Sequence, residues 1–161
     1  MRHQRRTTHL LSALSMLALL AACSPGQPSF VELATLERSP TPNDYLVCPQ
    51  SLTTAQVDRD PPISSLEVAA LERHWLTALE SEPRTRRLAS EADAQRHLFL
   101  QRTRVLRFPD LIQIDFVALP DGGSTLCLYS RSRYGHSDLG QNRRRIEDWL
   151  NRIGVPSPPA G

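Results

Sequence analysis

Hydrophobic residues recur at helical spacing between residues 64 and 81, which predicts a helix with one buried face. Ser64 followed by Glu67 has the spacing of a capping box, so the helix is expected to begin there. It is expected to end near Ser81, because Pro83 follows closely. The residues predicted to form the buried stripe are Leu66, Ala69, Ala70, Trp75, Leu76 and Leu79.

The middle of the chain has the alternation and turn signals that are typical of antiparallel strands. Every second side chain of residues 111–118 is apolar, whereas the intervening Gln113 and Asp115 are polar. Pro120-Asp121-Gly122-Gly123 is a hairpin signal, so residues 124–130 should form the partner strand. Further strands are expected over residues 84–89 and 97–108, the latter ending at Phe108-Pro109, with a turn or one helical turn over 91–96 and an extended segment over 45–49.

A second helix is predicted after the last strand, from an apolar stripe of Leu139, Ile146, Trp149, Leu150 and Ile153. Ser137 or Asp138 can cap its first turn, and Gly154 is a natural end. The order of helix, antiparallel strands and helix predicts an α+β fold in a single domain over residues 45–153. In this fold a small antiparallel sheet carries two main helices packed on one face.

The first 22 residues have the composition of a secretory signal peptide. Residues 1–9 carry three arginines, and the next thirteen residues, 10–22, are almost wholly apolar but too few to span a bilayer. The run ends in Leu20-Ala21-Ala22-Cys23, which resembles a bacterial lipobox, so lipidation of Cys23 is expected. The alternatives are an ordinary signal peptide with an unmodified cysteine and a short membrane anchor.

The resemblance to a lipobox implies a membrane anchor at Cys23 and a location in the bacterial cell envelope. Attachment through more than one acyl chain is effectively permanent. Ser24 after the cysteine favours the periplasmic face of the outer membrane, with the inner membrane as the alternative. Residues 23–44 are expected to form a tether, although residues 30–38 could make a short helical turn, and residues 154–161 are expected to form a disordered tail.

The charge of the chain gives no reason to expect nucleic-acid binding. Nineteen arginines, with no lysine, stand against seventeen carboxylates. Three of these arginines lie in the leader, which leaves sixteen and a net charge of about −1 on the rest of the chain. A nucleic-acid-binding domain needs a basic surface after processing, so no nucleic-acid partner is predicted.

Two cysteines remain after lipidation of Cys23. Cys48 and Cys127 could form a disulfide in an oxidising compartment. Alternatively, Cys127 is a small buried core residue and Cys48 is a free thiol. The histidines beyond the leader are scattered without the spacing of a metal site, so neither a metal nor a cofactor is predicted.

The segment between the last strand and the last helix is the part of the chain richest in arginine, glycine and serine. It reads Ser130-Arg131-Ser132-Arg133-x-Gly135-x-Ser137-Asp138-Leu139-Gly140-x-Asn142-Arg143-x-Arg145-Ile146. This segment resembles the signature of the family called domain of unknown function 1499, and Phe108-Pro109-Asp110, Pro83-Arg84-Thr85 and Cys48-Pro49 fit the same family. The resemblance covers roughly residues 45–153. It implies a small, mostly bacterial domain, often attached to the envelope, with no established activity.

The same segment is a candidate anion site. A helix N-terminus favours anions, glycines let the backbone approach a ligand, and arginine forks suit phosphate or carboxylate. The expected ligand is an anionic small molecule or an envelope lipid head group. The predicted ligand-binding residues are Arg131, Arg133, Gly135, Ser137, Asp138, Gly140, Asn142, Arg143 and Arg145.

A structural interpretation of the same arginines competes with the anion site. Arg131 and Arg133 would pair with nearby carboxylates to hold the loop, and residues 143–145 would form a solvated helix face. The domain would then be a module that contacts another envelope protein. The carboxylates available for such pairing are Asp110, Asp115 and Asp138.

An enzymatic function is the least favoured alternative. His136, Ser137 and Asp138 have the residue types of a hydrolytic triad, but adjacent residues cannot converge as a triad does. No nucleophile elbow, phosphate loop or zinc-protease pattern occurs in the sequence. No catalytic residue is therefore predicted.

Overall fold

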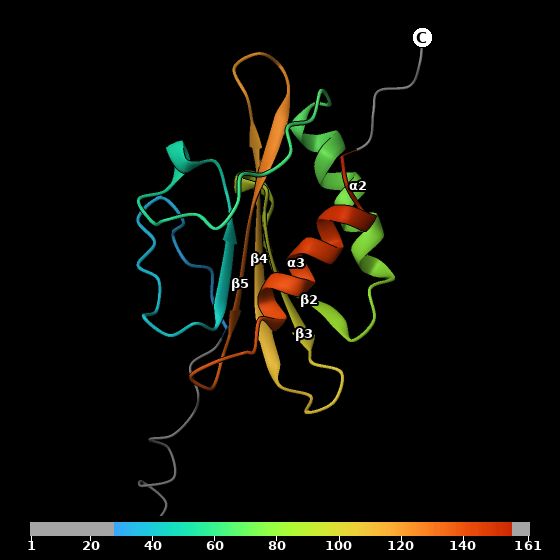
Figure 1. The fold of residues 1–161 in the computed structure, drawn as a ribbon. Coiled ribbons are helices and arrows are strands. Elements are labelled where there is room, and N and C mark those ends of the chain that lie inside the picture. The colour runs from blue at the N-terminus through green and yellow to red at the C-terminus, as the bar shows by residue number, and fades with distance from the viewer. Residues whose placement is uncertain (1–27, 156–161) are drawn as a thin grey trace, which may run out of the picture.

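Residues 28–155, which the computed structural model describes, form a five-stranded antiparallel sheet with two α-helices on one face (Figure 1). The elements are β1 (Asp44–Val47), η2 (Gln50–Leu52), α2 (Val68–Glu80), β2 (Thr85–Glu91), η3 (Ala92–Ala94), β3 (Arg96–Arg102), β4 (Pro109–Ala118), β5 (Ser124–Ser132) and α3 (Gln141–Arg152). The strands lie in the order β1-β5-β4-β3-β2. The predicted α+β fold with helices on one face of the sheet is confirmed.

The main hydrophobic core lies between the sheet and the two helices. Ile112, Ile114 and Phe116 of β4 share one face, and Trp75 of α2 and Trp149 of α3 belong to the same buried cluster. Both indole rings are fully buried. The period-two alternation of β4 therefore meets the period-3.6 stripes of the helices. The predicted stripes are wrong at two positions: Ala69 is exposed and Leu71 is buried in its place, and Leu139 precedes α3 and is exposed.

The carboxyl-terminal end of the domain is packed as far as the last described residue. Gly154 follows α3 with a φ of +61°, a conformation that glycine adopts readily at a helix end. Its carbonyl oxygen accepts a hydrogen bond of 3.1 Å from Nε1 of Trp75, and Val155 packs against the core. The remainder of the tail predicted over residues 154–161 lies outside the described residues, as do the signal peptide and Cys23.

The segment before β1 covers the face of the sheet opposite the helices, where Figure 1 shows it in blue and cyan. Leu33 and Leu36 are buried in a second cluster with Leu46, Cys127 and Tyr129. The prediction of a tether over residues 23–44 is therefore wrong from about residue 30 onward. These residues complete the domain, because without them an apolar face of the sheet would be open to water.

Polar residues of the sheet hold this segment in place. The Gln113 side chain accepts a hydrogen bond from the Val31 amide (2.9 Å) and donates one to the Val31 carbonyl oxygen (3.0 Å). Arg96 donates to the same carbonyl oxygen at 2.6 Å. Gln113 is fully buried, so the polar positions of the β4 alternation mark a second packed face rather than a solvated one.

Cys48, just after β1, and Cys127 in β5 form a disulfide, which decides between the two alternatives left open by the sequence. Both residues are buried in the cluster beneath the N-terminal segment. The bond closes a loop with a sequence separation of 79 residues. It therefore joins the first and last strands along the chain, which are neighbours in the sheet.

Two element boundaries differ from the predictions by four residues or more, and several others differ by one or two. α2 begins at Val68 rather than at Ser64, because Ser64 pairs through its backbone with Ser124, the first residue of β5. A Cβ atom on the adjacent Gly123 would lie 2.6 Å from the Ser64 carbonyl oxygen, so this close pairing requires glycine. β3 ends at Arg102 rather than at residue 108, and residues 103–108 form the β3–β4 loop.

Removal of the disulfide should strongly destabilise the domain. The Cys48→Ala, Cys127→Ala double variant is expected to unfold with a free energy lower by about 4–5 kcal/mol, because a loop of this length constrains the unfolded chain. Urea denaturation of the two proteins measures the difference. An unchanged denaturation midpoint, or an unchanged midpoint of the parent protein after reduction, would contradict the expectation.

Candidate functional site

Arg145 is the centre of a buried polar cluster beneath the start of α3. Its Nη2 lies 2.5 Å from Oδ2 of Asp110, and its Nε donates to the Gln101 side chain. Its Nη1 donates to Oγ of Ser130 (2.9 Å) and Oδ1 of Asn142 (2.6 Å). The Arg145 and Asp110 side chains are 2% and 1% exposed, so this ion pair is unavailable to a ligand.

The predicted solvated face over residues 143–145 is therefore wrong for Arg145. Arg145 lies four residues before Trp149 and so extends the buried stripe of α3 by one turn. Asn142 lies on the same stripe and donates to the backbone carbonyl oxygen of Asn43 (2.8 Å). The helical spacing from Trp149 was the signal in the sequence that distinguishes Arg145 from its two arginine neighbours.

Arg131 lies on the opposite face of the sheet from Arg145, because neighbouring side chains of β5 alternate between the faces. Its guanidinium group stacks over the Tyr129 ring at 5.3 Å, and its Nη2 donates to the Ser29 carbonyl oxygen (3.0 Å). Burial lowers the pKa of Arg131. Arg131 therefore forms no ion pair with Asp110, Asp115 or Asp138, the carboxylates considered for it in the sequence analysis. It instead holds the beginning of the N-terminal segment through Ser29.

The N-cap residue of α3 is Gly140, and Asp138, one of the two residues predicted to cap the first turn, supplies the carboxylate there. The Asp138 carboxylate accepts hydrogen bonds from the amides of Gly140 (2.9 Å) and Asn142 (2.6 Å), and its carbonyl oxygen accepts one from Gln141 (3.1 Å). A carboxylate of the chain itself therefore occupies the position that the sequence analysis assigned to an external anion. These three backbone donors are not available to a ligand.

The loop between β5 and α3, residues 133–140, separates two surface hollows. One, of about 490 Å³, is polar and includes Gly140 and Arg143. Its other wall contains Arg38, which is paired with Asp44 and Asp58, and these two carboxylates raise the pKa of Arg38 despite its partial burial. The carboxylates already balance the cations here, which gives an external anion little advantage.

Two tyrosines near this polar hollow act as hydrogen-bond donors. Burial, reinforced by the hydrogen bond to Glu147, raises the pKa of Tyr45 to about 12. Burial and a hydrogen bond to Asp44 raise the pKa of Tyr129 as well. Both phenols therefore stay protonated at neutral pH. The Tyr45 hydroxyl donates to Glu147 of α3, and the Tyr129 hydroxyl donates to Asp44 of β1.

The other hollow, of about 320 Å³, lies between the β3–β4 loop and the β5–α3 loop. Gly135, Ser137 and Asp138 of the predicted site line it, and Asp110 and Ser132 lie at its base beside the buried cluster. The hollow thus combines the predicted loop with a second loop that the sequence analysis treated as a strand. Its large apolar lining residues are Val105, Leu106, Phe108, Tyr134 and Leu139.

Two arginine side chains at this hollow form no ion pair within the described residues. Arg104 and Arg144 line it, and within residues 28–155 neither side chain has an ion-pair partner. The carboxylates that also line it are both engaged, Asp110 with Arg145 and Asp138 with backbone amides. Arg133 stacks over the Tyr134 ring at 5.6 Å at the same loop. The hollow therefore combines an apolar lining with the positive charges of Arg104 and Arg144, which pair with no carboxylate within residues 28–155.

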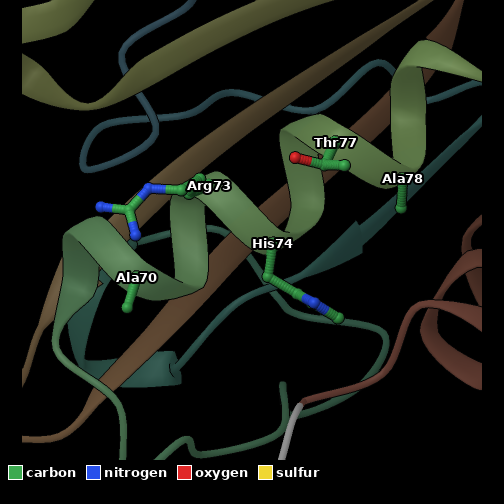
Figure 2. A pocket seen from close by; sticks show the side chains of 5 residues that line it. All are labelled: Ala70, Arg73, His74, Thr77 and Ala78. Carbon is green, nitrogen blue, oxygen red and sulfur yellow. The ribbon is translucent and has the colours of Figure 1, made fainter.

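A shallow depression of about 410 Å³ on α2 lacks these properties (Figure 2). Figure 2 shows Ala70, His74 and Ala78 pointing to one side of the helix, whereas Arg73 and Thr77 point away from them. Nε2 of His74 donates to the Ile153 carbonyl oxygen at 2.9 Å, so the imidazole serves to hold the end of α3. No convergent set of polar groups faces this depression.

Ser90, His97 and Glu72 form a hydrogen-bonded chain that the sequence analysis did not find. Nε2 of His97 donates to Glu72 at 2.7 Å, and Nδ1 lies 2.9 Å from the Ser90 hydroxyl. These are the residue types of a hydrolytic triad, brought together from β2, β3 and α2. His97 is 3% exposed, so this hydrogen-bonded chain serves to hold α2 against strands β2 and β3.

Neither a spanning helix nor a metal cluster occurs among residues 28–155. None of the helices there has the length and apolar content needed to cross a membrane. Within the same range, no three histidine, cysteine or acidic side chains are grouped in a way that could hold a metal ion.

Comparison with known proteins places the chain in one family. A family model described as "Protein of unknown function (DUF1499)" matches residues 20–153. The match confirms the resemblance and extends it to the N-terminal segment that covers the sheet. No curated protein matches the chain, and no solved structure matches it.

Loss of Arg145 should destabilise the domain, because it leaves the Asp110 charge buried without a partner. Arg145→Leu is expected to lower the free energy of unfolding by about 3–5 kcal/mol. Arg144→Leu is the matched control and should change it by about 0.5 kcal/mol or less, since Arg144 is exposed. Urea denaturation measures both values, and equal effects of the two substitutions would contradict the assignment.

Proposed function

The chain belongs to the DUF1499 family, and we propose that it is a lipid-anchored protein of the bacterial envelope whose domain is a non-catalytic binding module. The lipobox-like sequence ending at Cys23 and the basic, apolar leader before it support the anchor. The buried disulfide between Cys48 and Cys127 supports an oxidising compartment. Ser24 favours the periplasmic face of the outer membrane.

The observation that carries the binding function is the hollow between the β3–β4 and β5–α3 loops. An apolar lining favours an apolar ligand group, and the guanidinium groups of Arg104 and Arg144 favour an anionic one. The apolar lining and the two arginines belong to the same hollow. The buried ion pair between Arg145 and Asp110 and the sheet form a rigid base for it. The ligand that fits is an amphiphile with an anionic head group, such as a phosphate.

The anchor is tested by the fate of Cys23. The processed protein from bacterial envelopes should carry acyl groups on Cys23, measured by intact mass, and Cys23→Ser should abolish both the acylation and the processing. Ser24→Asp is the control for location: it should retain the acyl groups but move the protein to the inner membrane in fractionated cells. A processed chain whose mass shows no acyl group would contradict the anchor.

The hollow is tested with dihexanoylphosphatidylglycerol below its micelle-forming concentration. Binding should shift the amide resonances of Gly135 and Ser137, and Arg104→Gln and Arg144→Gln should each weaken it about tenfold, the effect of losing a charge-assisted hydrogen bond. Arg73→Gln on the outer side of α2 is the matched control and should leave the affinity unchanged.

A zwitterionic lipid with acyl chains of the same length separates the contribution of the anionic head group from that of the apolar chains. Dihexanoylphosphatidylcholine should bind more weakly than the anionic lipid to the parent protein. Its phosphate is balanced by the choline group, so the arginine substitutions should weaken its binding less than that of the anionic lipid. Equal affinity of the parent for both lipids, or no resonance shift with either, would contradict the proposed ligand class.

A further inference from the structure

The large exposed hydrophobic side chains gather at one end of the molecule. Among residues 28–155, seven such side chains are exposed, and five of them belong to the β3–β4 and β5–α3 loops. Val105 and Leu139 are each 83% exposed. Scattered exposed leucines need no explanation, but a contiguous group of this kind marks an interaction surface. The five side chains are Val105, Leu106, Phe108, Tyr134 and Leu139.

The backbone of both loops is held in conformations that project these side chains. Leu139 has a φ of +54° and Arg107 a φ of +58°, which non-glycine residues rarely adopt. The β3–β4 loop is closed by a backbone hydrogen bond of 2.9 Å from Thr103 to Phe108. Leu139 makes this strained turn although its side chain gains little burial within the domain, and such outliers concentrate at functional sites.

The charge at this end is positive, although the chain after the leader carries a net charge of about −1. The β3–β4 loop and the residue before it contain three arginines and no carboxylate. Two further arginines, Arg143 and Arg144, lie in the first turn of α3, and the one carboxylate of the β5–α3 loop, Asp138, caps this helix. Basic residues beside apolar ones fit a membrane surface with anionic head groups.

The described chain also begins at this end. The Ser29 carbonyl oxygen accepts a hydrogen bond from Arg131, which lies one residue before the end of β5. Figure 1 shows the start of the N-terminal segment beside this end of β5, which leads into the β5–α3 loop. Four residues lie between Cys23 and Pro28, so the five Cα-to-Cα steps that join them span at most about 18 Å. An acyl anchor at Cys23 therefore keeps this end of the domain close to the bilayer.

We propose that the two loops dock onto the anionic surface of the membrane that holds the acyl anchor, with Leu106 and Leu139 inserted among the lipids. This inference rests on the acylation of Cys23 in the proposed function. Apolar side chains at an interface insert about 5–10 Å, into the boundary between head groups and acyl chains. The hollow between the loops then opens toward the lipid head groups, so an anionic amphiphile can enter it directly from the bilayer.

The docking is tested with a solvatochromic fluorophore attached to single cysteines in the processed, acylated protein. Leu106→Cys and Leu139→Cys place the probe on the two loops. Ile63→Cys is the matched control, because Ile63 is 73% exposed and precedes Ser64, which pairs with the first residue of β5. β5 has nine residues, so the control lies about 26 Å from the loops along the strand.

The protein is reconstituted into phosphatidylethanolamine vesicles that contain phosphatidylglycerol and a quencher on the lipid acyl chains. Probes at positions 106 and 139 should shift to the blue and lose emission, whereas the probe at position 63 should keep its emission in water. Leu106→Asp introduced beside the probe at position 139 should restore its emission, and Ile63→Asp should not. Equal emission of all three probes would overturn the docking even if Cys23 is acylated.

Failure of the anchor is distinguishable from failure of the docking. If Cys23 carries no acyl group, the same probes are placed in the processed chain with Cys23→Ser and added to the same vesicles. Quenching at positions 106 and 139, weakened by salt, would support the docking without the anchor, and no quenching would overturn it. Shielding of these positions in whole envelopes but not in vesicles would indicate a protein partner and would overturn it as well.

Discussion

The buried ion pair between Arg145 and Asp110 is the constraint on which the arrangement of the domain depends. A charge taken out of water must be matched, so α3 can pack only where Arg145 reaches Asp110 and its polar neighbours. The pair joins α3 to β4, while Gln101 and Ser130 join it to β3 and β5. Asn142 extends the contact to the residue before β1. The start of α3, and with it the β5–α3 loop, therefore has one position relative to the sheet.

Both faces of the sheet are covered, which leaves its ends for function. The helices bury one face, and the N-terminal segment buries the other with the help of Gln113 and the disulfide. The hollow between the β3–β4 and β5–α3 loops lies at one end, directly above the Arg145 cluster. Loops on a rigid base are a common place for binding sites, because the scaffold fixes their positions while their sequence varies.

The arginine-rich segment shows where prediction from sequence failed. Nine residues were predicted to form one site because they lie close together in the chain. In the structure, Arg131 and Arg145 lie on opposite faces of the sheet, Asp138 fills the helix terminus, and only part of the β5–α3 loop lines the hollow. The β3–β4 loop was assigned to a strand, since its valine, leucine and phenylalanine have high β-propensity whether or not a strand partner exists.

The sequence by itself determined the class of fold, the hairpin, the second helix, its cap and the family, because these depend on local periodicity and on short motifs. Only the tertiary structure decided that Arg145 meets Asp110, that Cys48 meets Cys127, and that the segment before β1 belongs to the domain. These facts depend on which faces meet across long stretches of chain. Local pattern cannot specify them, because an arginine, a cysteine or a short apolar run reads the same whether its partner is water or a distant strand.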